Sequence, residues 1–236
     1  GADRTVAALW QGAADPVMKT ETAREINLNQ DLRLSSLPGA NVFWVAGFNV
    51  LRADRTFDMD MPAYSYFGGP MHQDRTLNQR KFKTESEALY GEMTYPLAEA
   101  LKLTAGLRHT WERKTFTGHY DKGASTFGGF PMTARSITGD QRSLSENYST
   151  GRLGLAYALT PATNVYAILA RGYKGGGFND NAAQVADGTP YKAAVANSLE
   201  LGFKSEAAER RFGLNGAFFL NRVKDDHLLS YDPGNN

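Results

Sequence analysis

The chain has 236 residues, of which 42% are hydrophobic, 11% aromatic and 22% charged, and it contains no cysteine. The lack of cysteine excludes disulfide scaffolds, thiol nucleophiles and cysteine-ligated zinc. The formal net charge of +1 is far from the strongly basic balance of nucleic-acid-binding domains, so no nucleic-acid partner is expected. Aliphatic and aromatic residues are frequent enough to indicate a folded chain.

Segments that would span a membrane as helices, or direct secretion, are not evident in the sequence. The longest apolar runs, residues 42–47 and 165–170, fall far short of the roughly 20 residues that a transmembrane helix needs. The chain opens Gly-Ala-Asp-Arg, without the basic and apolar regions of a signal peptide. Because it has no initiator methionine and its last residues close no pattern, we expect it to be part of a longer protein.

Apolar and polar residues alternate with period two along much of the chain, which is the pattern of strands with two different faces. In chain order, the segments that alternate or have a strand-rich composition are residues 5–11, 26–34, 42–50, 89–97, 101–111, 153–159, 165–173, 199–203 and 212–220. The first of these shows the weakest pattern. The other eight segments predict an all-β protein with about eight meander strands.

The connections between these segments alternate strictly between short and long. Short connections at residues 35–41, 96–100, 160–163 and 205–210 contain Pro, Gly or small polar residues, whereas the long ones run over about residues 53–83, 113–147 and 174–196. Loops beyond about 15 residues are uncommon in compact soluble domains. Tight turns on one side and long loops on the other are typical of a barrel that spans an outer membrane.

The two faces of the predicted strands differ in a way that suits such a barrel. The polar face carries small residues and charges of both signs, which suits a wet lumen. Aromatic residues near the short turns predict a girdle at the membrane interface: Tyr95, Tyr157, Tyr166, Phe203 and Phe212. A soluble antiparallel sheet would also alternate, and that alternative stays open at this point.

No motif in the sequence predicts catalysis, a metal site or a cofactor. The four histidines are scattered, and His119 with Asp121 is interpreted as part of a solvated loop. The glycine triple at residues 175–177 lacks the Lys-Ser/Thr of a phosphate-binding loop, so we interpret it as the flexible root of a loop. The protein is therefore not expected to be an enzyme.

Ligand recognition, if present, is expected on the long connections. Aromatic residues on loops rich in Gly and Pro suit stacking on a planar or apolar ligand, although they could instead hold each loop together. Arginine and lysine beside the glycine triple could meet an anionic ligand, or pair with Glu92 and Glu200. The candidate ligand-binding residues are Tyr64, Tyr66, Phe67, Phe127, Phe130, Arg171, Lys174 and Phe178.

Four stretches resemble TonB-dependent receptors of the bacterial outer membrane. The run ARGYKGGGFN at residues 170–179 is similar to the strand-to-glycine-loop signature of that family. Residues 197–205 with 211–222 resemble the strand pair that follows it, and residues 90–97 with 103–108 resemble its recurrent hairpin. Residues 29–36 resemble an earlier strand, so the likeness extends over about residues 21–225.

The resemblance implies that residues 1–236 form the middle-to-late wall of a single barrel domain of about 22 strands, here an open curved sheet in the outer membrane. Its partners would be membrane lipid, the TonB complex through an N-terminal part with plug and TonB box that this chain lacks, and a small ligand. The ligand expected first is an iron–siderophore complex. The alternatives are a complete eight-stranded outer membrane barrel acting as an adhesin or structural protein, and a soluble β-sheet carbohydrate-binding module.

Overall fold

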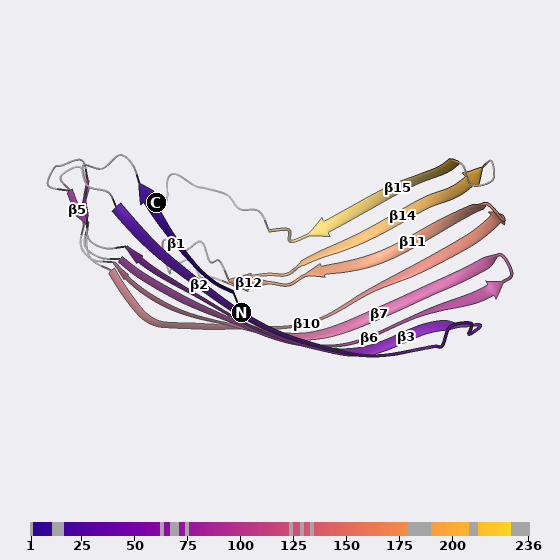
Figure 1. Ribbon diagram of the computed structural model, residues 1–236, viewed down its shortest axis with the longest axis horizontal. Coiled ribbons are helices and arrows are strands. Elements are labelled where there is room, and N and C mark those ends of the chain that lie inside the picture. The colour runs from indigo at the N-terminus through magenta and orange to yellow at the C-terminus, as the bar shows by residue number, and fades with distance from the viewer. Residues whose placement is uncertain are drawn as a thin grey trace.

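The computed structural model describes residues 2–10, 17–61, 64–66, 71–73, 76–122, 125–127, 130–132, 135–178, 190–207 and 212–227. Among these residues, nine antiparallel strands follow one another in chain order across a single curved sheet (Figure 1). They are β1 (Ala2–Trp10), β2 (Val17–Ser35), β3 (Phe43–Met61), β6 (Thr76–Ala98), β7 (Leu101–Lys122), β10 (Arg135–Thr160), β11 (Thr163–Lys174), β14 (Ala194–Ala207) and β15 (Phe212–Lys224). The predicted antiparallel meander is thus confirmed.

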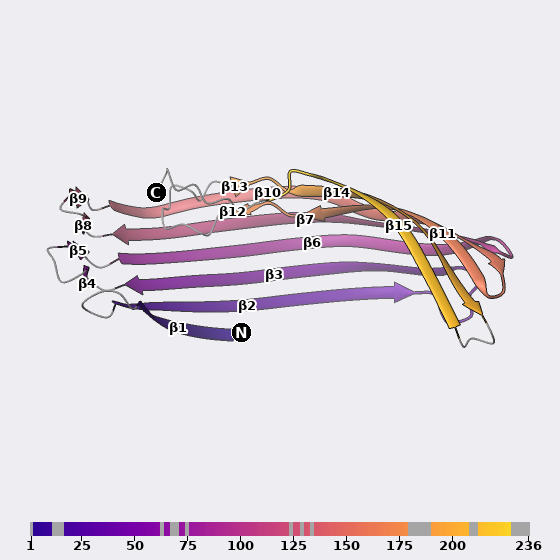
Figure 2. The same cartoon turned by 90° about the horizontal axis from the view of Figure 1, so that it is seen from above.

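Within the described residues, β1 and β15 are the two edges of this sheet, so the sheet is open. A complete eight-stranded barrel, one of the alternatives from the sequence, is therefore not what the chain forms. Figure 2 shows β1, β2, β3, β6, β7 and β10 running side by side, while β11, β14 and β15 turn away from them toward the short-turn end. Along most of its length β10 pairs with β7, but only residues 151–160 of β10 pair with β11.

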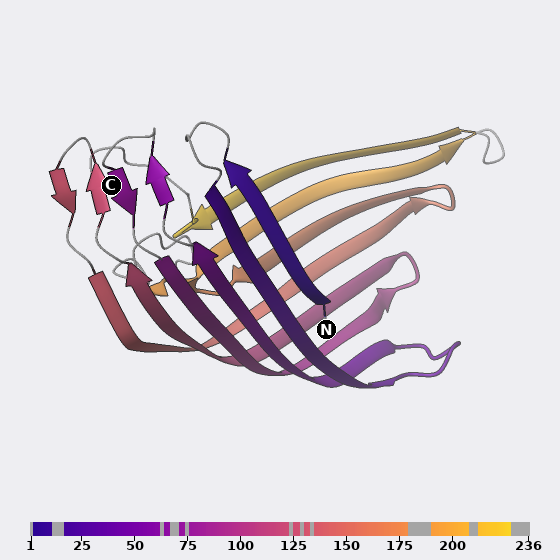
Figure 3. The same cartoon turned by 60° about the vertical axis from the view of Figure 1, so that its left-hand side comes forward.

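Two small sheets accompany the main one. The strands β4 (Tyr64–Tyr66), β5 (Met71–Gln73), β8 (Ser125–Phe127) and β9 (Phe130–Met132) form a four-stranded sheet in that order. It lies beyond the far ends of the β3–β6 and β7–β10 hairpins (Figures 2 and 3). The two-residue strands β12 (Gly177–Phe178) and β13 (Pro190–Tyr191) pair with each other.

The short connections lie together at one end of the sheet, as the sequence predicts (Figure 1). Two-residue turns join β6 to β7 and β10 to β11. In the longer turn between β2 and β3, the Ser36 amide donates to the Trp44 carbonyl at 2.9 Å and closes the hairpin. The part of the β14–β15 connection at residues 208–211 lies outside the described residues.

The long connections expected from the sequence differ most from the structure. The strands β6, β7 and β10 contain 23, 22 and 26 residues, whereas a strand needs about 9–11 residues to cross a bilayer. Most described residues of 53–83 and 113–147 therefore continue the strands. Charged pairs replace apolar ones on the outer face there, such as Asp54 opposite Lys83, so apolar alternation ends although the ladder of backbone hydrogen bonds continues.

The convex outer face of the sheet carries an apolar band beside the short turns. Its residues are uncovered: Leu28 is 62% exposed, Leu155 42% and Leu201 47%. A soluble sheet would bury such a face under a second layer, and the described residues provide none. The band is the surface that a lipid bilayer would cover. The described part of the chain includes no helix that is long and apolar enough to cross a membrane.

Aromatic residues flank the short turns as predicted, with one exception. Tyr95, Tyr157, Phe203 and Phe212 are all exposed. Tyr166 instead lies on the concave inner face, where its hydroxyl donates to Glu200 Oε1 at 2.7 Å. The register explains the difference, because Val165 pairs with outward Tyr157 and alternation then places Tyr166 on the opposite face. The predicted girdle is wrong for this residue.

Candidate functional site

A hollow of about 380 Å³ opens on the inner face, above the apolar band. The strands β3, β6 and β7 supply one side of it, and residues 175–178 with β13 supply the other. Among the residues that line it are three aromatic residues and two basic residues of the inner face: Phe82, Phe178, Tyr191, Arg55 and Lys114. Lys83 also borders the hollow, but its register position opposite Asp54 is on the outer face. Glu25 is the only acidic residue among the described lining residues, and Lys114 is paired with Glu112.

A row of phenylalanine rings crosses four strands at the base of the hollow. Ring centroids are 6.3 Å apart between Phe57 and Phe82, 5.1 Å between Phe82 and Phe116, and 5.7 Å between Phe116 and Phe178. Direct pairing of Phe82 with Phe116 across β6 and β7 sets the centre of the row. Phe116 is 1% exposed, so this row is the main apolar core of the inner face.

Two arginines pack on the faces of these rings. The Arg55 guanidinium carbon lies 4.8 Å from the centre of the Phe57 ring and 5.0 Å from that of Phe82. Arg80 lies 5.2 Å from the Phe57 ring centre on the same face of the sheet. Contacts of this kind contribute about 0.5–2 kcal/mol each and orient the planar guanidinium. An oriented guanidinium suits bidentate contact with a carboxylate or phenolate ligand.

The glycine triple forms the far side of the hollow, and we call residues 175–178 the strap. Gly176, Gly177 and Phe178 are all buried. The Gly176 carbonyl accepts a hydrogen bond from Lys114 Nζ at 2.6 Å, and its amide donates to Glu146 Oε2 at 3.0 Å. The sequence interpretation of a flexible loop root therefore differs from the structure, in which the strap is bonded to β7 and β10.

A pair of tyrosines supports the strap from below. The rings of Tyr148 on β10 and Tyr173 on β11 stack with centroids 3.5 Å apart and planes 12° apart. The Tyr173 hydroxyl hydrogen-bonds Glu146. It therefore binds the same carboxylate that accepts from the Gly176 amide.

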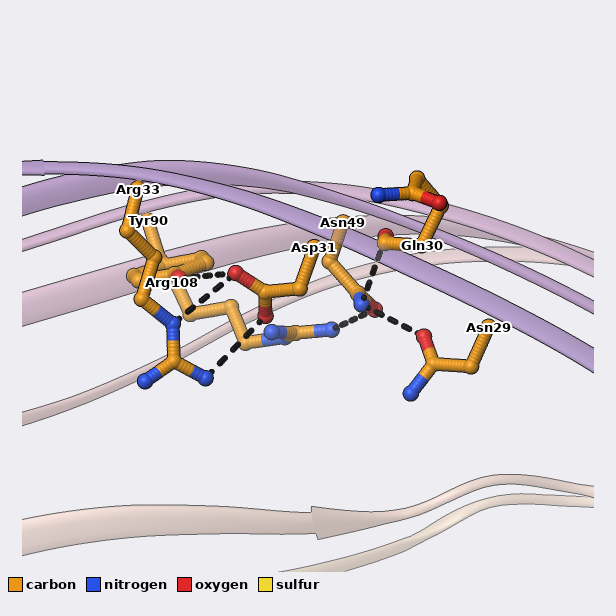
Figure 4. A network of polar contacts seen from close by, with 7 residues as sticks. All are labelled: Asn29, Gln30, Asp31, Arg33, Asn49, Tyr90 and Arg108. Carbon is orange, nitrogen blue, oxygen red and sulfur yellow. Dashed lines mark hydrogen bonds and ion pairs between the residues drawn. The ribbon is translucent and has the colours of Figure 1, made fainter.

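Below the hollow, at the height of the apolar band, polar side chains cover the inner face (Figure 4). The Tyr90 hydroxyl donates to Asp31 Oδ1 at 2.7 Å, and Arg33 Nε donates to the same oxygen at 2.9 Å. Arg108 Nη2 donates to Asn49 Oδ1 at 3.1 Å. Polar residues at this height face a lumen rather than lipid, as the sequence pattern predicts.

An ion pair crosses a whole strand on the same inner face. Arg152 on β10 donates two hydrogen bonds, of 2.6 and 2.7 Å, to the carboxylate of Glu92 on β6. The strand between them contributes Gly106, where a Cβ would lie 2.8 Å from Glu92 Oε2. The missing side chain of Gly106 thus makes room for the pair.

Four of the aromatic residues proposed from the sequence lie on the four-stranded sheet of β4, β5, β8 and β9, which we call the tip sheet. Pairing places Tyr64 opposite Gln73, Gln73 opposite Ser125 and Phe127 opposite Phe130. Because alternate residues of a strand share a face, Tyr64, Tyr66, Phe127 and Phe130 all have register positions on one face of this sheet. Phe67 lies outside the described residues.

The three candidates near the glycine triple differ in their exposure to solvent. Phe178 is 6% exposed and lines the hollow. Arg171 and Lys174 are exposed near the end of β11. The carboxylates that they could have paired with have other partners, since Glu92 binds Arg152 and Glu200 accepts from Tyr166.

Sequence reasoning missed the residues that the hollow depends on. Arg55, Phe57, Arg80 and Phe82 lie within the expected loop at residues 53–83. The signal that could have found them is an arginine followed two residues later by a phenylalanine, as in Arg55 and Phe57 and again in Arg80 and Phe82. It indicates a strand with a basic and aromatic inner face.

A family model described as TonB dependent receptor-like, beta-barrel matches residues 6–236. The chain belongs to this family. TonB-dependent receptors are outer membrane barrels that act as transporters rather than enzymes, and this chain forms part of such a barrel wall. The curated relatives include the Pesticin receptor of Yersinia enterocolitica, 27% identical over 150 residues, and that of Yersinia pestis, 27% identical over 146 residues. The alignments cover 64% and 62% of this chain, respectively, and 20% of each relative.

Solved structures of receptors share the fold. The ferric yersiniabactin uptake receptor FyuA from Yersinia pestis aligns with a TM-score of 0.74 at 23% identity, over 96% of this chain and 32% of that one. The ferric-catecholate import receptor Fiu from Escherichia coli K12 aligns with a TM-score of 0.59 at 18% identity, over 91% of this chain and 33% of that one. The TonB-dependent receptor segment described here therefore corresponds to about a third of a full barrel chain.

Proposed function

We propose that this segment belongs to a receptor that imports a ferric siderophore, and that the hollow above the apolar band is part of its ligand-binding surface. The basic and aromatic lining of the hollow supports this proposal most directly. A ferric siderophore with phenolate or carboxylate groups has negative charge and often planar rings, which suit Arg55 and Phe82. The names of the Yersinia pestis and Escherichia coli receptors, which take up ferric complexes, also support this ligand class.

The partners follow from the same proposal. Membrane lipid covers the apolar band, and the TonB complex acts through a part of the receptor outside this chain. Residues 1–236 form part of one barrel domain. The tip sheet, with Tyr64, Tyr66, Phe127 and Phe130 on one face by register, extends the ligand-capture surface beyond the hollow. Arg171 and Lys174 remain proposed contacts with an anionic ligand.

The test is uptake of iron-55 siderophore by cells that express the complete receptor as their only siderophore importer. Arg55→Gln should lower uptake at limiting ligand about tenfold, because a charge-assisted contact to an anion is lost. Arg52→Gln is the matched control, since Arg52 lies on the same strand but is exposed on the outer face opposite Glu85. Equal uptake by both variants and the parent would contradict the proposed role of the hollow.

A further inference from the structure

The strap is held by two side chains that bind the backbone of one residue, Gly176. Lys114 Nζ donates to the carbonyl of Gly176 at 2.6 Å, while Glu146 Oε2 accepts from its amide at 3.0 Å. Lys114 comes from β7 and is paired with Glu112 at 2.9 Å, whereas Glu146 comes from β10. We call Lys114, Glu146 and Gly176 the Gly176 clamp. It ties the strap to two strands at the height where β10 no longer pairs with β11.

The clamp leaves no room for a side chain at position 176. A Cβ on Gly176 would lie 2.5 Å from the Tyr191 carbonyl oxygen and 3.0 Å from both Glu146 Oε1 and Leu144 Cδ2. A Cβ on Gly175 would lie 2.8 Å from Glu112 Oε1 and from Lys114 Nζ. The ends of Glu112 and Lys114 could shift away from a Cβ on Gly175, but the Tyr191 carbonyl is backbone, so the clamp requires glycine at position 176.

The clamp determines where two of the aromatic lining residues stand. Phe178 follows Gly176 by two residues, and its ring packs on Phe116. Tyr191 pairs with Gly177, the residue next to the clamped peptide. Arg55 and Phe82, in contrast, belong to β3 and β6 and do not depend on the strap for their position. The hollow thus has one wall, with Arg55 and Phe82, that the main sheet fixes, and another, with Phe178 and Tyr191, that the clamp holds in place.

We propose that Glu146 is a positioning residue that sets the preference of the hollow for ligands with aromatic rings. It is not among the described residues that line the hollow, so it acts on a ligand only through the strap. The Tyr173 hydroxyl, bonded to Glu146, orients its carboxylate toward Gly176. The effect on a ligand rests on the proposed function, whereas the position of the strap does not.

The position of the strap is tested by hydrogen exchange with mass spectrometry on the complete receptor in detergent. Glu146→Ala should speed exchange of the amides at residues 176–178 about tenfold or more, because the Gly176 amide loses its acceptor. Glu146→Gln should stay close to the parent, since its amide oxygen can accept the same bond. Glu87→Ala, an exposed outer-face acid, is the control. Unchanged exchange in Glu146→Ala would overturn the positioning role.

The preference for aromatic ligands is tested with two probes, the ferric complex of 2,3-dihydroxybenzoate and ferric citrate. Glu146→Ala should weaken binding of the aromatic complex about tenfold and change that of ferric citrate less than about twofold. Equal losses for both probes, or no loss for either, would overturn the proposed preference. If the parent receptor binds neither probe, the proposed function fails for these ligands, and the exchange result still decides the role of Glu146.

A second variant separates the strap from the charge of Glu146. Gly176→Ala leaves both clamp side chains in place but forces the strap away from Tyr191. It should reproduce the exchange and binding pattern of Glu146→Ala. Gly172→Ala is its matched control, because a Cβ there meets only the Ala196 side chain at an ordinary 3.9 Å. Parent-like behaviour of Gly176→Ala would contradict the clamp.

Discussion

Tyr90 lies across Gly47, its cross-strand partner, so that the ring occupies the space that a side chain at position 47 would need. The ring reaches Asp31 on the next strand by crossing over this glycine, and its hydroxyl donates to that carboxylate at 2.7 Å. Tyr166 lies over Gly202 in the same way and reaches Glu200. At both places on the inner face, a glycine allows a tyrosine of the neighbouring strand to lie flat against the sheet.

Gly47→Ala should therefore destabilise the barrel by about 1–3 kcal/mol, because the new Cβ overlaps the Tyr90 ring and lies 2.8 Å from the Leu32 carbonyl oxygen. Thermal unfolding of the complete receptor in detergent measures the change. Gly154→Ala is the control, since its Cβ would meet only atoms at 3.7 Å or more. An equal effect of both variants would show that strand glycines act through backbone entropy rather than through the crossing ring.

Tyr90→Phe keeps the ring over Gly47 and removes only the hydroxyl that donates to Asp31. We expect a loss of about 0.5–1.5 kcal/mol, the net value of one hydrogen bond, because Arg33 continues to pair with the carboxylate. Tyr95→Phe, at an exposed position, should be neutral in the same unfolding experiment. A loss in Tyr95→Phe as large as in Tyr90→Phe would contradict the assignment.

The Glu92–Arg152 pair is suited to a double-mutant cycle. Both side chains are partly open to solvent, 28% and 54% exposed, so we expect a coupling free energy of only about 0.2–1 kcal/mol. The coupling should fall as salt is raised from about 0.05 to 0.5 M, because exposed charges are screened. The coupling free energy is calculated from the free energies of unfolding of four proteins: the parent, Glu92→Gln, Arg152→Met and the double variant. Coupling that does not change with salt would indicate that the pair is shielded from solvent.

The outer apolar band can be tested on a single strand. Leu155→Arg places a charge within the band and should cost about 2–4 kcal/mol at mid-bilayer depth, lowering the amount of folded, heat-modifiable receptor in the outer membrane. Ser145→Arg lies on the same face of β10, above the band and already exposed, so it should assemble normally. Equal assembly of the two variants would place the membrane elsewhere.

The half of each strand beside the short turns could be predicted from sequence because one face must be apolar toward lipid and the other polar toward the lumen. Leu153, Leu155 and Tyr157 show that alternation, and they are exposed on the outer face. The far halves could not be predicted in this way. Their outer face meets water rather than lipid, so charged residues such as Asp54 and Lys83 replace apolar ones there although the strands remain paired.

The hollow was harder to predict because it depends on register between segments that are distant in sequence. Phe82 and Phe116 become neighbours only through the pairing of β6 with β7. Phe178 was a candidate from the sequence, but its contact with Phe116 requires the strap to fold back over the sheet. No local sequence pattern could predict this position of the strap, because the clamp joins Gly176 to side chains 62 and 30 residues away.

The hollow and the polar network lie at two different heights along the strand β6. Phe82 at the hollow and Tyr90 in the polar network are eight residues apart on that strand, or about 27 Å along it. A molecule resting against Phe82 must therefore move inward along the wall before it reaches the polar network around Tyr90. Under the proposed function, capture at the hollow and passage along the inner face involve different residues, so a variant that impairs one need not impair the other.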